Sequence, residues 1–152
     1  MRISARADYA VRAAIELAAA PPGTPVKAET IARNQDIPRE FLENILRDLR
    51  RRGLVRSQRG AEGGSMLARP AADIRVAEVL RAVEGPLAAV RGVRPDSLKY
   101  TGPAESLVDV WIALRASLRS VLDEVTLADI ATGALPAVVR KAAADPANWQ
   151  PR

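Results

Sequence analysis

The sequence predicts a mainly α-helical protein with a small β-hairpin, arranged as a winged helix-turn-helix domain plus a long C-terminal dimerisation helix. Three observations lead to this class. Two short helical segments flank a break at Gln35–Pro38, a glycine-rich run at 59–64 separates two short strand segments, and a heptad repeat of apolar residues follows Pro103. A chain of 152 residues has room for one compact domain with an added dimerisation element.

Helical periodicity predicts the first three elements. Ser4 can cap a first helix that ends before Pro21, and a short second helix covers 27–34. Pro38 suits the first position of a third helix over 39–52, which Gly53 stops. The apolar stripe of that third helix consists of Phe41, Leu42, Ile45, Leu46 and Leu49. The second and third helices thus have the lengths and the break of a helix-turn-helix.

The segment after Gly53 is predicted to be a β-hairpin with a long tip. Strand segments 54–57 and 65–69 flank the glycine-rich run, and a helix over 76–84 follows. Residues 87–102 contain Gly and Pro without periodicity, so we expect a linker or a partly ordered loop there.

Pro103 is predicted to open the longest helix, whose apolar residues recur at spacings of four and three. This heptad seam consists of Leu107, Trp111, Leu114, Leu118, Val121 and Val125. A heptad seam is typical of a helix that pairs with a second copy, although such a stripe can also cover its own domain. Thr126 with Asp129 indicates a further short helix, and Pro136 begins a last one that is followed by a loose tail.

The net charge of +5 lies in the first half of the chain. Residues 1–70 hold 13 Arg or Lys against 8 acids, whereas residues 71–152 hold 10 against 10. A basic half beside a neutral one favours a module that binds a polyanion, because phosphate neutralisation drives nucleic-acid affinity. Arg outnumbers Lys by 20 to 3, so a GC-rich genome is an alternative source of the basic pI.

Composition excludes several classes of protein. The chain has neither Cys nor His, which removes disulfides, thiol catalysis and imidazole acid–base chemistry. No run approaches the ~18 apolar residues of a membrane span, and the charged N-terminus does not resemble a signal peptide, so we expect no membrane and a cytoplasmic protein. The best acid–base candidates, Glu84, Asp96 and Glu105 near Lys99 or Tyr100, have no spacing that marks a catalytic site, and we expect no enzyme.

The outward face of the third helix carries side chains suited to reading DNA. With the apolar stripe turned inward, the exposed residues are Arg39, Glu40, Glu43, Asn44, Arg47 and Arg51. Arg39, Glu43 and Asn44 can pair with base edges, and Arg47, Arg50 and Arg51 suit phosphates. Alternatively, Glu43 and Arg47 form an ordinary surface pair on a solvated helix.

The hairpin tip carries Arg59 and Gly60, and together they fit a wing that enters a narrow minor groove. The same glycines could form a merely flexible turn. No Lys-Ser/Thr pair follows them, so the run is not a nucleotide-binding loop.

Several motifs together resemble the Rrf2 family in order and spacing. They are Met1-Arg-Ile-Ser4, Tyr9-Ala-Val-Arg12, Ile31-Ala32, Ile37-Pro38, Phe41-Leu-Glu43, Leu46, Leu49, Gly53-Leu-Val55, Arg59-Gly60, Gly63-Gly64, Glu84-Gly-Pro-Leu87, Trp111 and Thr126-Leu-Ala-Asp129. The resemblance covers about 130 residues and implies a dimeric winged-helix regulator, often a repressor. It also implies DNA contacts by Arg2 and Tyr9, by Glu43 and its neighbours, and by Arg59. Ser65 stands where the family has a Tyr.

Some members of this family hold an iron–sulfur cluster on three cysteines placed before the Trp of the long helix. The corresponding stretch, Ala88 to Val110, has no Cys, and the whole chain lacks Cys and His. We therefore expect no such cofactor and no metal site. Arg91, Arg94, Lys99 and Tyr100 could instead line a site for an unknown small-molecule or protein effector, unless the loop is only a solvated linker.

The sequence thus predicts a sequence-specific regulator that binds double-stranded DNA at a palindromic operator as a homodimer. Repression is favoured over activation as its role. The expected segments are a DNA-binding domain over 1–86, a linker or sensor loop over 87–102, a dimerisation helix with short helices over 103–145, and a tail over 146–152. The alternative is a winged-helix adaptor that docks a partner protein without specific DNA binding.

Overall fold

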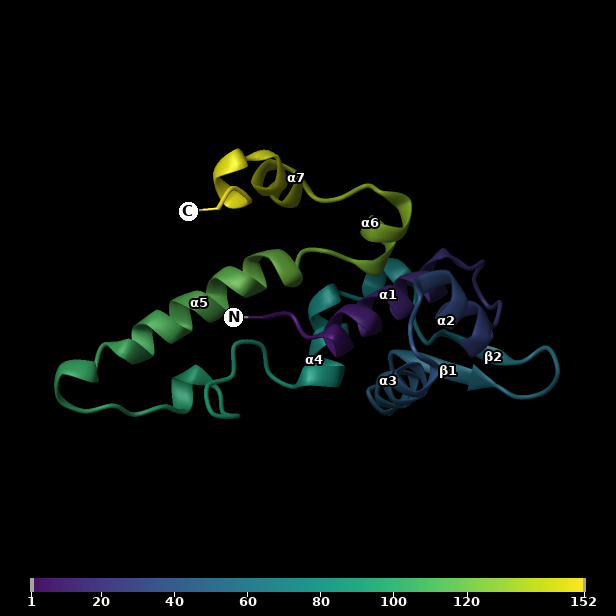
Figure 1. Cartoon of the computed structure of the whole chain (residues 1–152), viewed down its shortest axis with the longest axis horizontal. Coiled ribbons are helices and arrows are strands. Elements are labelled where there is room, and N and C mark those ends of the chain that lie inside the picture. The colour runs from purple at the N-terminus through teal and green to yellow at the C-terminus, as the bar shows by residue number, and fades with distance from the viewer. Residues whose placement is uncertain (1, 152) are drawn as a thin grey trace.

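In the computed structural model, which describes residues 2–151, a winged-helix body carries one long helix that projects away from it (Figure 1). The α-helices are α1 (Ala5–Ala19), α2 (Ala28–Gln35), α3 (Arg39–Arg51), α4 (Val76–Glu84), α5 (Leu107–Leu122), α6 (Leu127–Thr132) and α7 (Ala137–Ala144). The strands are β1 (Val55–Gln58) and β2 (Gly64–Leu67), and short 3-10 turns are η1 (Ala71–Asp73), η2 (Pro95–Ser97), η3 (Gly102–Ala104) and η4 (Pro146–Asn148). Met1 and Arg152, the ends of the first and last expected segments, lie outside the described residues.

Helix α1 is the centre of the body, and α2, α3, α4 and α6 all pack against it. Ser4 caps this helix as predicted, since its Oγ accepts a hydrogen bond of 3.0 Å from the amide of Ala7. Small buried residues such as Ala10, Ala13 and Ala14 let the neighbouring helices approach closely. The resulting core contains large side chains from all of these elements, among them Ile31, Leu42 and Leu127.

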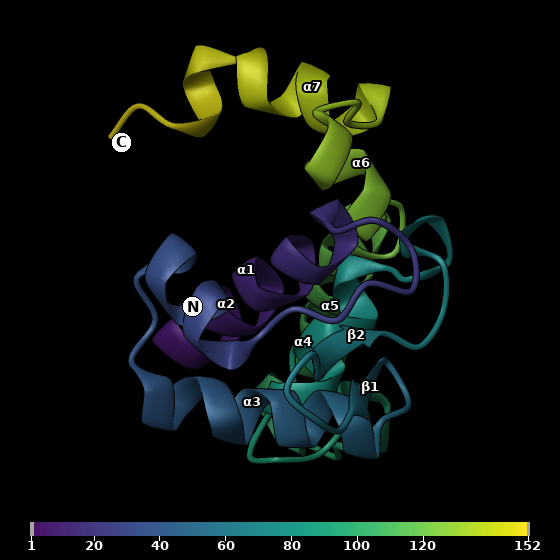
Figure 2. The ribbon, with the colours of Figure 1, turned by 90° about the vertical axis from the view of Figure 1, so that its right-hand side faces the viewer.

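The helix-turn-helix is formed by α2 and α3. Asp36 ends α2 in the left-handed conformation, and α3 begins directly after Pro38. Leu42, Ile45 and Leu49 are fully buried, so the opposite face of α3 is held towards solvent (Figure 2). Phe41 departs from the predicted apolar stripe, because it lies at the edge of the core and is 44% exposed.

The wing is an antiparallel hairpin in which Val55 pairs with Leu67 and Gln58 pairs with Gly64. Its second strand is also attached to the segment before α2: the Val26 amide donates to the Ser65 carbonyl at 2.8 Å, and the Ser65 amide donates to the Val26 carbonyl at 2.9 Å. This bridge fixes the base of the wing to the helix-turn-helix.

The chain returns to the body after α5. The amide of Val76 donates to the carbonyl of Val125 at 2.9 Å, and the amide of Leu127 donates to the carbonyl of Ile74 at 3.0 Å. Thr126 and Asp129 then form the predicted capping box of α6. Because this pairing extends the backbone, α5 ends at Leu122, and Val125, expected in the helical seam, lies outside the helix and is buried against the body.

The segment before α5 also differs from expectation. Pro103 belongs to the separate turn η3, and α5 starts only at Leu107. The expected linker packs against α5 through η2, with Pro95 and Leu98 buried, and the guanidinium of Arg115 donates to the carbonyl of Leu87 at 3.1 Å. None of the described helices is long and apolar enough to cross a membrane.

Candidate nucleic-acid interface

The start of α3 carries an exposed cluster of three charged side chains. The Arg39 guanidinium lies 2.7 Å from the Glu29 carboxylate on α2 and 3.1 Å from the Glu43 carboxylate one helical turn along α3. Hydrogen bonds with Glu43 and Glu29 raise the pKa of Arg39. A backbone hydrogen bond and then the contact with Arg39 lower the pKa of Glu29. All three side chains are exposed, so their contacts with one another can be exchanged for contacts with a ligand.

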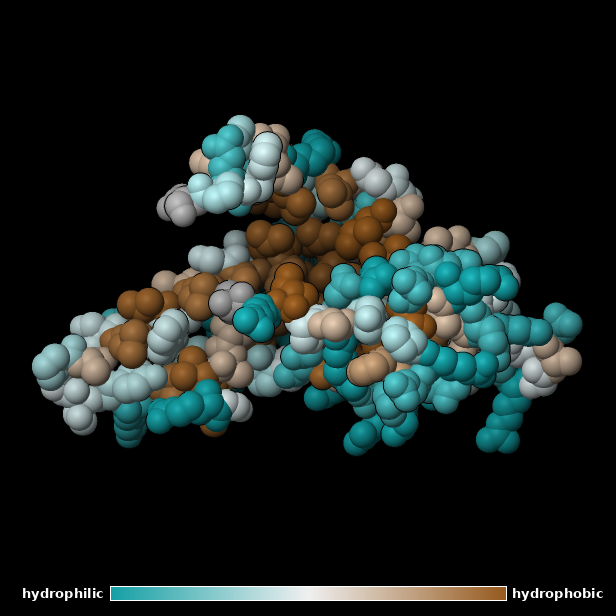
Figure 3. All heavy atoms as spheres, in the orientation of Figure 1, coloured by the Kyte–Doolittle hydropathy of each residue, from teal (hydrophilic) through white to brown (hydrophobic). Residues whose placement is uncertain are grey.

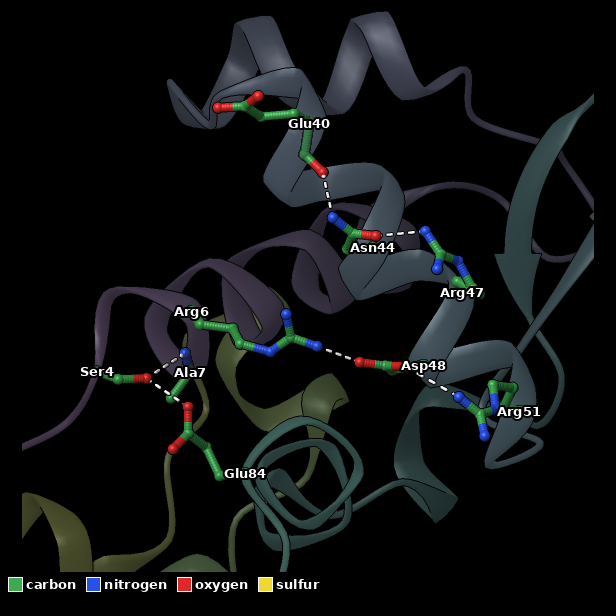
Figure 4. Close-up of polar contacts among 9 residues, drawn as sticks. All are labelled: Ser4, Arg6, Ala7, Glu40, Asn44, Arg47, Asp48, Arg51 and Glu84. Atoms are coloured by element: carbon green, nitrogen blue, oxygen red, sulfur yellow. Dashed lines mark hydrogen bonds and ion pairs between the residues drawn. The ribbon is translucent and has the colours of Figure 1, made fainter.

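Asn44 links two other residues of the same face (Figure 4). Its amide nitrogen donates to the backbone carbonyl of Glu40 at 3.0 Å, and its amide oxygen accepts a hydrogen bond from Arg47. Asn44 thereby orients the Arg47 guanidinium in the free protein. Both side chains are exposed, so base edges or phosphates could replace these contacts.

Further along α3, a half-buried ion pair joins the helix to α1. The Arg6 guanidinium contacts the Asp48 carboxylate, and Arg51 approaches the same carboxylate at 3.9 Å (Figure 4). Arg6 and Asp48 therefore fix the orientation of α3, while the Arg51 side chain, 78% exposed, stays available. No local sequence pattern marks this pair, because its members are 42 positions apart.

Tyr9 supports the other end of α3 through its ring. The ring meets Phe41 edge-on with centroids 6.1 Å apart, and the Arg12 guanidinium lies 5.0 Å from the Tyr9 ring centroid. Arg12 also donates to the carbonyl of Gln35 at the end of α2. Tyr9 thus packs at the junction of α1, α2 and α3 and is half-buried.

The wing tip presents a cation. Gly60 has a φ of 104°, which an L side chain rarely adopts, and the Gly63 amide closes the turn by donating to the Gly60 carbonyl at 3.0 Å. Arg59 is exposed beside this turn and has no carboxylate partner within residues 2–151. The tip therefore offers a positive charge on a backbone that can approach a ligand closely.

A cleft of about 350 Å³ connects α3 with the wing. Arg47 and Arg50 line it from the helix, and Ser57 and Gln58 line it from β1. Side chains that accept and donate hydrogen bonds thus line both walls. Ser57 and Gln58 are not among the residues predicted from the sequence, although their exposed positions on a short polar strand could have indicated them.

The predicted DNA-contacting residues occupy four places in the structure, one of which is the position of Tyr9 at the junction of α1, α2 and α3. The six residues of α3 share one exposed face, and Arg59 and Gly60 lie on the adjacent wing. Arg2 lies elsewhere, because it lines a cavity beside Leu80 of α4 and Leu118 of α5. The structure therefore does not bring Arg2 together with the α3 face within one chain.

The candidate effector residues do not all converge. The Arg91 guanidinium lies 6.0 Å from the Tyr100 ring centroid, within cation–π range, whereas Arg94 makes two hydrogen bonds of 3.0 and 2.9 Å with the Asp96 carboxylate. Lys99 is exposed. Arg91 and Tyr100 are thus the pair that the loop places together.

Helix α5 has no buried residue along its 16 positions. The five seam residues that lie on it are half-buried, and Val110 and Ile112 are exposed by 55% and 40%. Hydrophobic atoms continue along the side of α5 that faces α6 and α7 (Figure 3). The helix therefore presents more apolar surface than its own chain covers.

Comparisons with known proteins agree with this architecture. The family model described as "Rrf2: Iron-dependent Transcriptional regulator" matches residues 3–133. A Mycobacterium tuberculosis protein named as an HTH-type transcriptional regulator is 56% identical over 145 residues, which are 95% of this chain and 90% of that protein. The HTH-type transcriptional regulator CymR of Bacillus subtilis is 33% identical over 132 residues, 87% of this chain and 91% of CymR.

Solved structures show the same fold. The structure of CymR, titled as the global cysteine regulator of B. subtilis, matches with a TM-score of 0.73 at 32% identity, covering 88% of this chain and 98% of that chain. The structure of T. potens IscR matches with a TM-score of 0.72 at 35% identity, covering 88% of each chain. The mainly helical body with its hairpin is thus a winged-helix fold of the kind found in these transcription regulators. The family and its relatives are regulators and not enzymes.

The family description refers to iron, so a member that binds iron must have side chains that can ligate it. Iron–sulfur clusters are held mainly by Cys thiolates, with His in some sites. The sequence has no Cys and no His, and the described residues contain no group of three or more acidic side chains placed to hold a metal ion. The residues present do not fit such a cluster.

Proposed function

Because the chain belongs to the Rrf2 family of HTH-type transcriptional regulators, we propose that it binds a palindromic DNA operator as a homodimer and represses transcription there. The observation that carries the proposal is the continuous exposed surface formed by α3 and the wing, with Arg39, Arg47 and Arg59 along it. A dimer that occupies a promoter blocks access by polymerase, which is the simplest mode of repression.

In the proposed complex, α3 lies in the major groove and the wing reaches the neighbouring minor groove. Arg39, Glu43 and Asn44 read base edges near the helix start, after their contacts with one another and with Glu29 and Glu40 are exchanged. Arg47, Arg50 and Arg51 contact phosphates on either side. The Arg6–Asp48 ion pair holds α3 at a fixed angle, so it acts as a positioning contact rather than a reader.

The dimer is supported by the unburied apolar surface of α5. A 16-residue helix is ~24 Å long, and it joins the body at its C-terminal end while its N-terminal end points away (Figure 1). Pairing two such helices antiparallel places the two bodies at opposite ends, whereas parallel pairing would bring them to the same end. An antiparallel dimer also suits recognition helices about 34 Å apart, one turn of the duplex.

Regulation in this proposal does not depend on a cluster. The segment 87–102 lies against α5, where Arg91 and Tyr100 form a cation–aromatic pair that an anionic or aromatic effector, or a partner protein, could engage. An effector bound there would act on the dimer helix, and through it on the spacing of the two recognition helices.

Arg59→Ala tests the role of the wing. We expect DNA affinity to fall by about 1–3 kcal/mol, with unchanged folding, because Arg59 supplies a groove contact in the proposed complex and forms no ion pair within residues 2–151. Arg94→Ala is the matched control: it removes the same charge from the segment beside α5, so affinity should hardly change. Equal affinities of the wild type and Arg59→Ala in fluorescence anisotropy would remove the wing from the mechanism.

A further inference from the structure

We propose that the C-terminal arm, residues 136–150, covers the α5 helix of a second copy of this chain and so extends the dimer interface. This inference rests on the proposed α5 dimer, and it adds a contact that the heptad seam does not supply. The arm contains α7 and η4 and lies beyond residue 133, where the match to the Rrf2 family model ends.

The arm is well formed but has little contact with its own chain. Within residues 2–151, η4 is the one element with which α7 makes a substantial contact. The Asp145 carboxylate caps η4 by accepting from the backbone amide of Ala147 at 3.0 Å, and the side-chain amide nitrogen of Asn148 donates to the Ala142 carbonyl at 2.9 Å. These internal bonds hold the arm as a unit, while Val138 and Trp149 remain exposed by 47% and 66%.

The space-filling view shows a gap between part of the arm and α5 (Figure 3). Both ribbon views place α7 beyond α6 and apart from the long helix (Figures 1 and 2). In the space-filling view, hydrophobic atoms lie along the side of α5 that faces this space and also on the facing side of α6 and α7 (Figure 3). An apolar element that fills the space between two such surfaces would remove both from water, which is favourable.

The second copy's α5 has the apolar faces that this space requires. Its seam residues would pack against the seam of the first α5, as in a two-stranded coiled coil. Asp109 and Ile112 lie three positions apart on the side away from the seam, and both are exposed in the single chain. The seam alone leaves this outer side uncovered, so a further element is needed there.

Charge and spacing match the outer side of α5 to the arm. On α7, Val138 and Lys141 are also three positions apart and exposed. Each of the two helices thus presents an apolar residue beside a charged one, and the charge is negative on α5 and positive on α7. Asp109 and Lys141 make no ion pair within residues 2–151. In an antiparallel pair, the N-terminal half of the second copy's α5, which contains Asp109, lies beside the C-terminal half of the first α5. The chain continues from that end of the first α5 into α6 and the arm (Figure 1).

Cysteine pairing between chains tests this contact, and the natural absence of Cys makes the readout unambiguous. One tagged chain carries Val138→Cys, a second tagged chain carries Ile112→Cys, and the mixed dimers are treated with a short bismaleimide. We expect a covalent species that contains both tags. Ala61→Cys, in the exposed wing tip, replaces Ile112→Cys in the control mixture and should give no such species with Val138→Cys.

Deletion of residues 136–152 is the second measurement. The dimer dissociation constant from sedimentation should rise about tenfold or more, the effect of one well-buried interface residue, without loss of helical signal from the body. A chain carrying both Val138→Cys and Ile112→Cys that cross-links only within itself would overturn the proposal, because the arm would then cover its own helix. A dimer with no cross-link and an unchanged dissociation constant would overturn the arm contact alone, whereas a monomeric wild type would overturn the proposed dimer as well.

Discussion

Gly64→Ala should detach the wing from the helix-turn-helix. A Cβ added at Gly64 would lie 2.4 Å from the carbonyl oxygen of Val26 and 2.6 Å from its carbonyl carbon, closer than real Cβ atoms come. Strand β2 would have to move away from Val26, and the two backbone hydrogen bonds of 2.8 and 2.9 Å between Val26 and Ser65 would be lost. Because each hydrogen bond contributes about 0.5–1.5 kcal/mol, the loss of both should lower the free energy of unfolding by about 1–3 kcal/mol.

Urea unfolding followed by circular dichroism measures this change, at one fixed protein concentration because dimerisation contributes to stability. Ser65→Ala is the matched control: it removes a hydroxyl from the same strand but keeps both backbone bonds, so its unfolding midpoint should stay close to that of the wild type. DNA affinity should also fall for Gly64→Ala, since the displaced wing no longer holds Arg59 beside α3. A Gly64→Ala protein as stable as the Ser65→Ala protein would refute this account of the wing base.

Three further predictions concern the dimer, the α6 cap and the phosphate contacts. Leu118→Asp places a charge in the α5 seam and should give monomers in sedimentation, and a dimer of unchanged strength would exclude the seam. Hydrogen bonds from the backbone and side chain of Thr126 lower the pKa of Asp129 below 3.8 in the folded chain, so the unfolded chain binds the proton first as pH falls. The stability that this carboxylate contributes is therefore fully present above about pH 4 and is lost as pH falls through the pKa of the folded chain. In urea unfolding at a series of acid pH values, the stability of Asp129→Asn should fall less steeply with pH than that of the wild type. An equally steep fall would contradict the role of Asp129 in the α6 cap. Arg50→Ala should weaken binding to all duplexes equally and reduce the slope of log K against log salt by about one, whereas a change in base preference would make Arg50 a reader.

Local signals in the sequence predicted much of the fold. Ser4, and Thr126 with Asp129, mark helix starts by their capping hydrogen bonds, and Pro38 marks the start of α3 by its fixed backbone angle. The 3.6-residue spacing of Leu42, Ile45 and Leu49 orients α3. These features depend on residues within one or two turns of each other. The exposed face of α3 followed from them, because a helix that buries one side must present the other.

Contacts between distant segments account for what the sequence could not predict. The Arg6–Asp48 pair and the bridge from Val26 to Ser65 join positions about 40 apart, and no local pattern marks them. Val125 fits the heptad spacing but is drawn out of the helix by its pairing with Val76. A periodic pattern gives the face of a helix, whereas tertiary hydrogen bonds decide where the helix ends.

Specific binding of two chains to DNA can be measured by fluorescence anisotropy with a labelled duplex from the region upstream of the coding sequence. We expect saturable binding on the order of 10⁻⁸ M near physiological salt, two chains per duplex, and a footprint with half-sites about 10 base pairs apart. A scrambled duplex of equal length should not compete. Weak binding that ignores sequence and disappears as salt rises would contradict the account and favour a winged-helix adaptor that docks a protein.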